Sequence, residues 1–247
     1  MQWYAMAMEV ILTTLGPDWW KKNCTSNAVK PDEFLAVPDD SAQSAYNHQD
    51  RIIKLGHMLY ALRDCNGFDS FISALVTRDV APAFFELWVA NALRQNEYTI
   101  EFVDPLGEKG TDYDLRCDRN TIRLNIEAKS RRAGMLVSEN SLRNALKKAR
   151  TQLPASGPNV IFISIPAEWT TQANAESKIT SCIQTFFHNS ARVNYVVLMW
   201  HGWLQLAERM ASLTFIRQYD NPNARAPVAL ETVIKPVTLP LDVTSEK

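Results

Sequence analysis

The sequence contains few cysteines, and they are far apart. Cys24, Cys65, Cys117 and Cys182 form no Cys-x-x-Cys pair. Structural zinc sites use closely spaced ligands, and small disulfide-stabilised domains use many cysteines. The spacing argues against both kinds of site, and scattered cysteines are typical of proteins in a reducing cytoplasm.

Long hydrophobic runs and an excess of charge of one sign are also missing. No run approaches the roughly 18 apolar residues that a membrane-spanning helix needs, so no membrane association is expected. Residues 1–15 lack a basic n-region and are interrupted by Glu9, which favours a buried helix or strand over a signal peptide. The net charge is -1, so a nucleic-acid-binding role would have to depend on a local patch.

Motifs of several enzyme classes are absent as well. The chain has no glycine-rich phosphate loop, no Gly-x-Ser-x-Gly elbow and no protein-kinase signature set. It is 247 residues long, with 46% hydrophobic and 21% charged residues. This composition predicts a buried core, and the length allows a core of about 150 residues with an extension.

The pattern of apolar residues divides the chain into two predicted parts. Residues 1–80 are predicted to form a helical N-terminal extension, with helices at 46–62 and 68–76. Residues 81–247 are predicted to form an α/β core with a mixed central sheet flanked by helices. The expected elements of the core are a helix at 82–95, strands at 98–103, 113–117 and 121–129, a helix at 138–153, a strand at 160–165, a helix at 173–188 and a strand at 195–200.

The predicted strand at 121–129 separates apolar from polar side chains, because strand side chains alternate between two faces. The apolar face contains Ile122, Leu124, Ile126 and Ala128, and the polar face contains Arg123, Asn125, Glu127 and Lys129. Glu127 and Lys129 are therefore near neighbours. We expect that truncating either side chain removes no core volume.

The preceding strand can bring a second carboxylate to the same place. Asp112 and Asp114 share one face of that strand, and a short turn at 118–120 leads to the next strand. Either aspartate can therefore lie near Glu127. A symmetric tight turn would place Asp112 directly opposite Glu127 and Asp114 on the diagonal.

Two carboxylates and an ammonium group in a small volume suit phosphodiester hydrolysis. Carboxylate oxygens are ligands for Mg²⁺ or Mn²⁺, and a bound ion polarises a phosphate and activates water. Lys129 could orient that water or offset the negative charge that develops on the phosphate. The alternative is an amphipathic hairpin with one solvated face, since Glu-x-Lys is a common triplet.

A further carboxylate, Glu86, lies at the edge of the apolar arc of the helix at 82–95. Burial there would require a partner, such as a metal ion, a lysine or a metal-bound water. The alternative is a surface glutamate that the helix macrodipole favours near the helix start.

Seven basic residues and a single acidic residue, Glu139, occur between positions 129 and 150. Arg143, Lys147 and Arg150 form a row beside the buried stripe of the helix at 138–153, and such a row can follow a phosphate backbone. We expect nucleic acid to contact Arg131, Arg132, Arg143, Lys147 and Arg150. The alternative is a solvated helix face.

Taken together, these features resemble the PD-(D/E)xK, or restriction-endonuclease-like, nuclease superfamily. The resemblance covers roughly residues 82–200 and depends on Glu86, Gly-Thr-Asp-Tyr-Asp-Leu at 110–115 and Ile-Glu-Ala-Lys at 126–129. It implies a restriction-endonuclease-like core and a metal site formed by Asp114 (or Asp112) and Glu127. It also implies that Lys129 is the superfamily lysine and that Glu86 is the helix glutamate of many members.

The sequence departs from the superfamily pattern in one respect, because no proline precedes the aspartate. Asp114 is the preferred ligand, since the superfamily aspartate usually runs straight into an apolar stretch, as Asp114 does into Leu115. Gln152 would match, weakly, a glutamine that some members carry on the following helix.

The sequence therefore predicts a divalent-metal-dependent nuclease that acts on DNA in preference to RNA, in restriction, phage defence or repair. The alternative is a non-catalytic nucleic-acid-binding or interaction protein on a degenerate nuclease fold. The complete set of Asp, Glu and Lys favours the enzyme. The helical extension would recognise substrate, form a homodimer or contact another protein.

Overall fold

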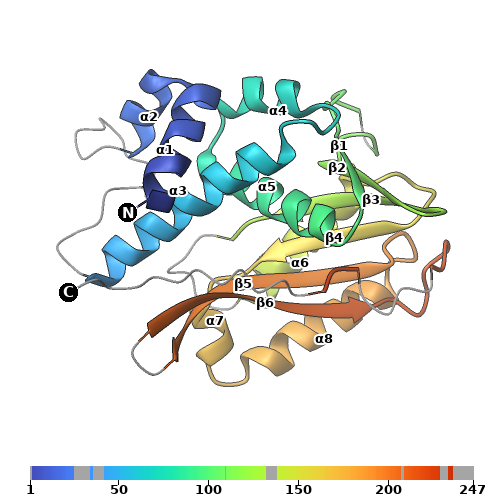
Figure 1. Ribbon diagram of the computed structural model, residues 1–247. Helices are drawn as coiled ribbons and strands as arrows, with labels where there is room; N and C mark the ends of the chain where they lie inside the picture. The colour runs from blue at the N-terminus through green and yellow to red at the C-terminus, as the bar shows by residue number, and fades with distance from the viewer. Residues whose placement is uncertain are drawn as a thin grey trace. The chain divides into compact units, whose positions relative to one another are not determined.

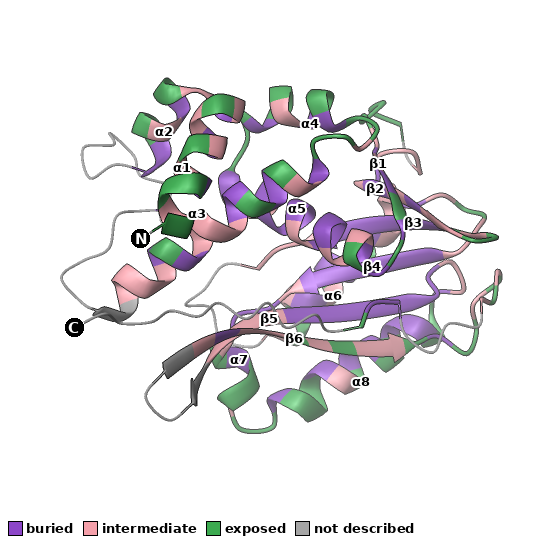
Figure 2. Ribbon diagram, viewed as in Figure 1, coloured by how far each residue is buried: buried purple, intermediate pink, exposed green. Residues whose placement is uncertain are grey.

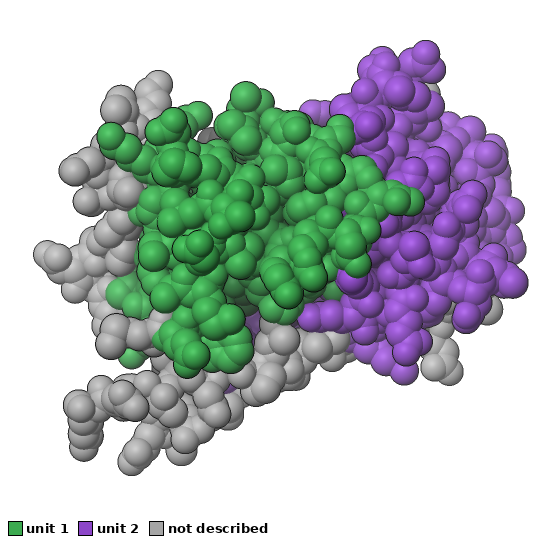
Figure 3. Space-filling view, turned by 45° about the horizontal axis from the view of Figure 1, so that its top comes forward, with its two compact units in different colours: residues 1–91 green, residues 92–247 purple. Residues whose placement is uncertain are grey.

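The computed structural model in Figure 1 describes residues 2–24, 34–35, 42–108, 110–131, 138–206, 209–228 and 233–235. The chain forms two compact units, residues 1–91 and 92–247, which Figure 3 distinguishes by colour. The division falls inside helix α5 (Val80–Gln95), later than the boundary that the sequence suggests at residue 80.

The first unit is helical. Its elements are α1 (Gln2–Leu15), α2 (Pro17–Cys24), α3 (Ala42–Leu62), α4 (Phe68–Leu75) and the first part of α5. Helix α1 packs on α3, and Ala7 of α1 occupies the space that a side chain at Gly56 of α3 would need. The predicted helices at 46–62 and 68–76 are confirmed, and the N-terminal segment is a helix that buries Ile11 and Leu15.

The second unit is built on one mixed sheet of six strands in the order β1-β2-β3-β4-β5-β6. The strands are β1 (Thr99–Phe102), β2 (Leu115–Arg119), β3 (Ile122–Lys129), β4 (Asn159–Ser164), β5 (Tyr195–Leu206) and β6 (Arg209–Asp220). Strands β3, β4 and β5 are parallel, and the other neighbouring pairs are antiparallel. The predicted α/β fold with a mixed sheet is confirmed.

Three helices of the second unit follow β3 and β4 in the chain: α6 (Glu139–Gln152), α7 (Glu168–Thr171) and α8 (Ala175–His188). Ser138 caps α6 by accepting a hydrogen bond from the Ser141 backbone N–H, as side chains at this position commonly do. Apolar side chains of α6 and α8 share one buried cluster with residues of β4 and β5. These helices therefore cover one face of the sheet (Figure 1).

Both faces of the central strands are buried, as predicted (Figure 2). On β4, Ile161 and Ile163 face the helix cluster, while Val160 and Phe162 point to the opposite side, and all four are 0% exposed. Parallel strands need crossover connections, and the helices in those connections cover the sheet.

The structure also contains elements that the sequence did not predict. Helix α7 and strand β6 were missed, and β5 continues to Leu206, beyond the predicted end at residue 200. Strand β2 begins at Leu115, two residues later than expected. None of the described helices is long and apolar enough to cross a membrane.

Candidate active site

The pairing of β2 with β3 decides which aspartate lies beside Glu127. Leu115 pairs with Ile126, and Arg119 pairs with Ile122, so Asn120 and Thr121 form the turn. Asn120 has a φ of 55°, a left-handed conformation that asparagine tolerates well. The predicted turn at 118–120 was one residue too early. The expectation that Asp112 would stand directly opposite Glu127 is therefore wrong.

Asp114 is attached to β3 on both sides of Glu127. Its backbone N–H donates to the carbonyl of Ile126 at 3.0 Å, and its carboxylate accepts from the backbone N–H of Ala128 at 2.7 Å. The Asp112 carboxylate lies elsewhere, because it accepts hydrogen bonds from the backbone N–H groups of Leu106 and Gly107 at 2.9 and 2.8 Å. The structure thus places Asp114 next to Glu127 and uses Asp112 to shape the preceding loop.

Glu127 and Lys129 form an ion pair, as their positions on one face of β3 predict. The Glu127 side chain is 0% exposed and that of Lys129 is 23% exposed. Asn125, on the same face, is also buried and donates a hydrogen bond to Asn159 of β4 at 3.1 Å. The expectation that truncation on this face removes no core volume is wrong, because β4 pairs beside it and α6 packs on β3.

The carboxylate of Glu127 is completely buried, so its negative charge needs a compensating positive charge. An ionised carboxylate removed from water is very unfavourable unless a positive charge compensates it. The ammonium group of Lys129 supplies that charge. Asp114, which directly precedes β2, is hydrogen-bonded to the two β3 neighbours of Glu127, and Glu127 is ion-paired with Lys129.

Glu86 belongs to the first unit and has its own partner there. It is 6% exposed and forms an ion pair with Arg78. Of the two alternatives that the sequence left open, a buried glutamate with a partner is confirmed and a surface glutamate is wrong. The partner is an arginine eight positions earlier in the chain, a contact that the helical wheel could not indicate.

The basic row on α6 is only partly available to a ligand. Arg143 lies 4.0 Å from Glu139, and Arg150 donates to the backbone carbonyl of Asn189 at 3.4 Å. Lys147 is exposed. Two of the three predicted phosphate contacts thus also interact within the fold, and Lys147 is the most accessible of the row.

Arg131 and Arg132 are the two predicted nucleic-acid contacts between β3 and α6. Arg131 donates to the backbone carbonyl of Ser141 at 2.6 Å, and burial lowers the pKa of its guanidinium group. This bond ties the end of β3 to the first turn of α6. Arg132 lies outside the described residues.

Gln152, at the end of α6, helps to hold the loop that carries the aspartates. Its side-chain N–H donates to the backbone carbonyl of Asp112 at 3.1 Å. This contact joins α6 to the segment just before Asp114. The sequence pointed to Gln152 only weakly, and its position in space supports a structural role near the site.

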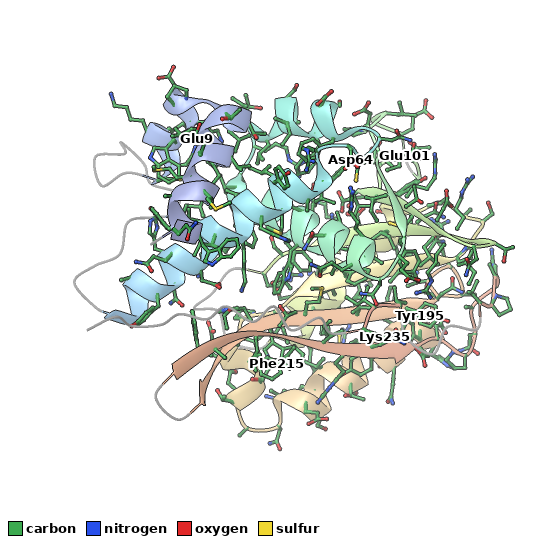
Figure 4. All side chains as sticks on the ribbon, in the orientation of Figure 1. Glu9, Asp64, Glu101, Tyr195, Phe215 and Lys235 are labelled. Carbon is green, nitrogen blue, oxygen red and sulfur yellow. The ribbon has the colours of Figure 1, made fainter. Side chains whose placement is uncertain are left out.

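A polar network beside Asp114 was not recognised from the sequence. Arg116 lies 3.0 Å from both carboxylate oxygens of Glu101, which Figure 4 labels, and donates to the Tyr113 hydroxyl at 2.9 Å. The hydrogen bond to Tyr113 and the charge of Glu101 raise the pKa of Arg116. The network links Tyr113 and Arg116, which flank Asp114 and Leu115 in the chain. The sequence did place Arg116 on the same strand face as Asp114, and this pattern could have indicated the network.

The carboxylates of Asp114 and Glu127 are hard oxygen donors, which suit Mg²⁺ or Mn²⁺ with water in the remaining positions. Within the described ranges, no group of three or more His, Cys, Asp or Glu side chains could hold a metal ion. A two-carboxylate site is therefore the candidate, and its donor chemistry fits such an ion.

No protein-family model matches this chain, and no curated protein is significantly similar to it. The geometry of the second unit is thus what supports a functional proposal.

Proposed function

We propose that this protein is a divalent-metal-dependent nuclease of the PD-(D/E)xK type that hydrolyses phosphodiester bonds, in DNA in preference to RNA. The observation that carries the proposal is the attachment of Asp114 to β3 on both sides of Glu127, whose carboxylate pairs with Lys129. The restriction-endonuclease-like assignment of the core is part of the same proposal. It is supported by the order of α5, three antiparallel strands, α6 and a parallel strand.

Each residue has a definite role in this proposal. Asp114 and Glu127 would hold Mg²⁺ or Mn²⁺, which would polarise the phosphodiester and assist deprotonation of the attacking water. Lys129 forms an ion pair with Glu127. Two cations compete for one carboxylate, so metal binding would release the ammonium group to stabilise charge on the phosphate.

The second candidate is a non-catalytic binding protein on a related fold. The complete burial of Glu127 favours it, because a carboxylate neutralised by a neighbouring lysine also describes a structural ion pair. A structural pair alone does not account for the placement of Asp114, a second carboxylate, beside the first.

Cleavage assays with the full-length chain separate the two candidates. Supercoiled, linear and single-stranded DNA and RNA would be incubated with Mg²⁺, Mn²⁺ or EDTA. We expect cleavage only with metal, and loss of cleavage in Glu127→Gln. Asp118→Asn is a matched control, because Asp118 is a carboxylate of the same hairpin paired with Arg123.

Undiminished cleavage in EDTA would exclude the metal mechanism. A folded Glu127→Gln variant that cuts at the parent rate would exclude this site. Binding of nucleic acid without cleavage under any metal condition would favour the second candidate.

Substrate binding can be tested on α6 separately from catalysis. Neutralising Arg143, Lys147 and Arg150 together should weaken binding across sequences. It should also lower the slope of log affinity against log salt by roughly 0.9 per lost contact with duplex DNA. Because Arg143 and Arg150 also interact within the fold, Lys147→Ala alone should account for most of the loss. An unchanged slope would identify the row as a solvated face.

A further inference from the structure

Strand β6 forms one edge of the sheet, and it is long and regular. Its register with β5 runs without interruption from Tyr195↔Asp220 to Leu206↔Arg209. No other strand in the described part of the chain pairs with it. An edge strand presents a row of backbone donors and acceptors that a further strand can use.

The usual devices that protect an edge strand are missing from the middle of β6. Natural edge strands are kept from pairing by charged side chains, prolines, bulges or short length. Residues 210–216 read Met-Ala-Ser-Leu-Thr-Phe-Ile and contain no charge and no proline, and the pairing with β5 skips no residue. The opposite edge of the sheet differs, because β1 has four residues and carries the ion-paired Glu101.

An aromatic side chain is held at the surface near the middle of this edge. Phe215, labelled in Figure 4, is 39% exposed, and its ring stacks on Trp200 with 5.5 Å between centroids and 10° between planes. It also fills the space above Gly202, where a Cβ would lie 2.9 Å from the Phe215 ring. Phe215 is therefore fixed in place although more than a third of it is exposed, and Figure 2 shows most of the described part of β6 as intermediate or exposed.

We propose that β6 pairs in antiparallel fashion with β6 of a second copy of this chain, so that two six-stranded sheets join into one. A two-fold axis perpendicular to a sheet relates antiparallel neighbours, so a strand can pair with its own copy. In an antiparallel pair, residues directly opposite each other point to the same face of the sheet. When a strand pairs with its own copy, one residue therefore stands opposite itself, and the two-fold axis passes beside it. With Phe215 on the axis, the two aromatic rings face each other and Arg217 stands opposite Leu213.

The charges of the chain are compatible with a second copy as the occupant. In this register no like charges stand opposite each other along residues 211–219. The net charge of -1 causes little long-range repulsion between two copies. A facing pair of aromatic side chains is among the favourable cross-strand pairs. This surface differs from the N-terminal extension, which the sequence suggested for dimerisation, and the inference does not depend on the proposed function.

The oligomeric state of the full chain tests the proposal. Sedimentation velocity should give twice the mass of one chain for the parent and the mass of one chain for Phe215→Lys, because two ammonium groups would then meet at the axis. The controls are Leu106→Lys and Trp3→Lys, which place the same charge at side chains 69% and 66% exposed. Both controls should remain dimers.

Hydrogen exchange of the parent provides a second measurement that needs no variant. Between residues 212 and 218, the backbone amides that point away from β5 should exchange more slowly at high than at low protein concentration, because self-association covers the edge. A monomeric parent, exchange of these amides that is independent of concentration, or a dimer that Trp3→Lys disrupts and Phe215→Lys does not, would overturn the proposal.

Discussion

The hairpin β2–β3 carries two ion pairs that have the same chemistry and opposite surroundings. Near the turn, Arg123 donates to both oxygens of Asp118 at 2.8 and 3.2 Å, with side chains 66% and 41% exposed. At the other end, Lys129 pairs with Glu127, whose side chain has no exposed surface. Water screens the first pair, so it contributes little to stability. The second pair has lost that screening, so Glu127 depends on Lys129 for its charge balance.

The two pairs differ in the desolvation free energy that each requires, which is large only for the buried Glu127–Lys129 pair. Replacing a buried ion pair by well-packed apolar residues is often neutral or stabilising, by up to about 4 kcal/mol. Stability alone therefore gives no reason for a buried Glu127–Lys129 pair beside Asp114. The exposed pair near the turn needs no such reason. The contrast supports a functional interpretation of the buried end of the hairpin.

The largest expected effect follows from breaking the buried pair. Lys129→Met should lower the free energy of unfolding by about 3–5 kcal/mol, because the buried Glu127 would lose the ammonium group that it is paired with. Urea denaturation measures this value. Glu127→Gln combined with Lys129→Met should recover most of the loss. A single variant that loses less than about 1 kcal/mol would show that the pair is effectively solvated.

A second prediction concerns the two aspartates. Asp114→Asn should reduce the metal-dependent cleavage rate by roughly 100- to 1,000-fold, the scale for a preorganised electrostatic group. Asp112→Asn should have a milder effect, because its carboxylate binds backbone N–H groups of the loop. Single-turnover rates at saturating metal give the comparison. The reverse ranking would assign the metal to Asp112.

Competition between Lys129 and a metal ion gives a third prediction, which does not require activity. Removing the ammonium group should increase Mn²⁺ affinity by about fivefold or more, since a like charge near the metal is worth at least about 1 kcal/mol. Titration calorimetry of Lys129→Met and the parent, under conditions where both are folded, measures the change. Unchanged or weaker Mn²⁺ binding would mean that Glu127 is not a ligand.

The Lys54–Asp50 ion pair of the first unit predicts how stability depends on pH. Burial lowers the pKa of Lys54, although the charge of Asp50 at 2.8 Å partly opposes this. Between the lowered pKa and the ordinary value of 10.5, the unfolded chain binds more protons than the folded chain at this group. This group therefore makes the free energy of unfolding increase as pH rises towards 10.5.

Lys54→Met lacks this contribution. The stability of the parent relative to the variant should therefore increase as pH rises towards 10.5, as urea denaturation over a pH series would show. A difference that stays constant, or that changes in favour of the variant, would contradict the lowered pKa.

The smallest effect is expected at the exposed end of the hairpin. Arg123→Ala should leave the free energy of unfolding nearly unchanged and leave cleavage unaffected, because solvent screens its pair with Asp118. Thermal unfolding and the cleavage assay measure both quantities. A loss as large as that of Lys129→Met would remove the distinction between the two ends.

Much of the fold could be predicted from local patterns. The helices α3, α4, α6 and α8 and the central strands followed from periodicity, because each buries a face that its own sequence displays. Strand β6 was missed because it lies at an edge, where few positions are buried and the alternation is weak. Helix α7 was missed because its four residues are too few for a periodic signal.

The sequence by itself determined that Glu127 and Lys129 share one side of β3, because the alternation of side chains is a property of the extended backbone. Tertiary structure decided three other features of the candidate site. The turn at Asn120 and Thr121 set the register that brings Asp114 beside Glu127. The parallel strand β4 and helix α6 buried the polar face of β3, for which a solvated hairpin face was the alternative. The chain also brought Arg78 to Glu86 as an ion-pair partner. Register, burial and partner choice depend on residues far away in the chain, and no local pattern contains them.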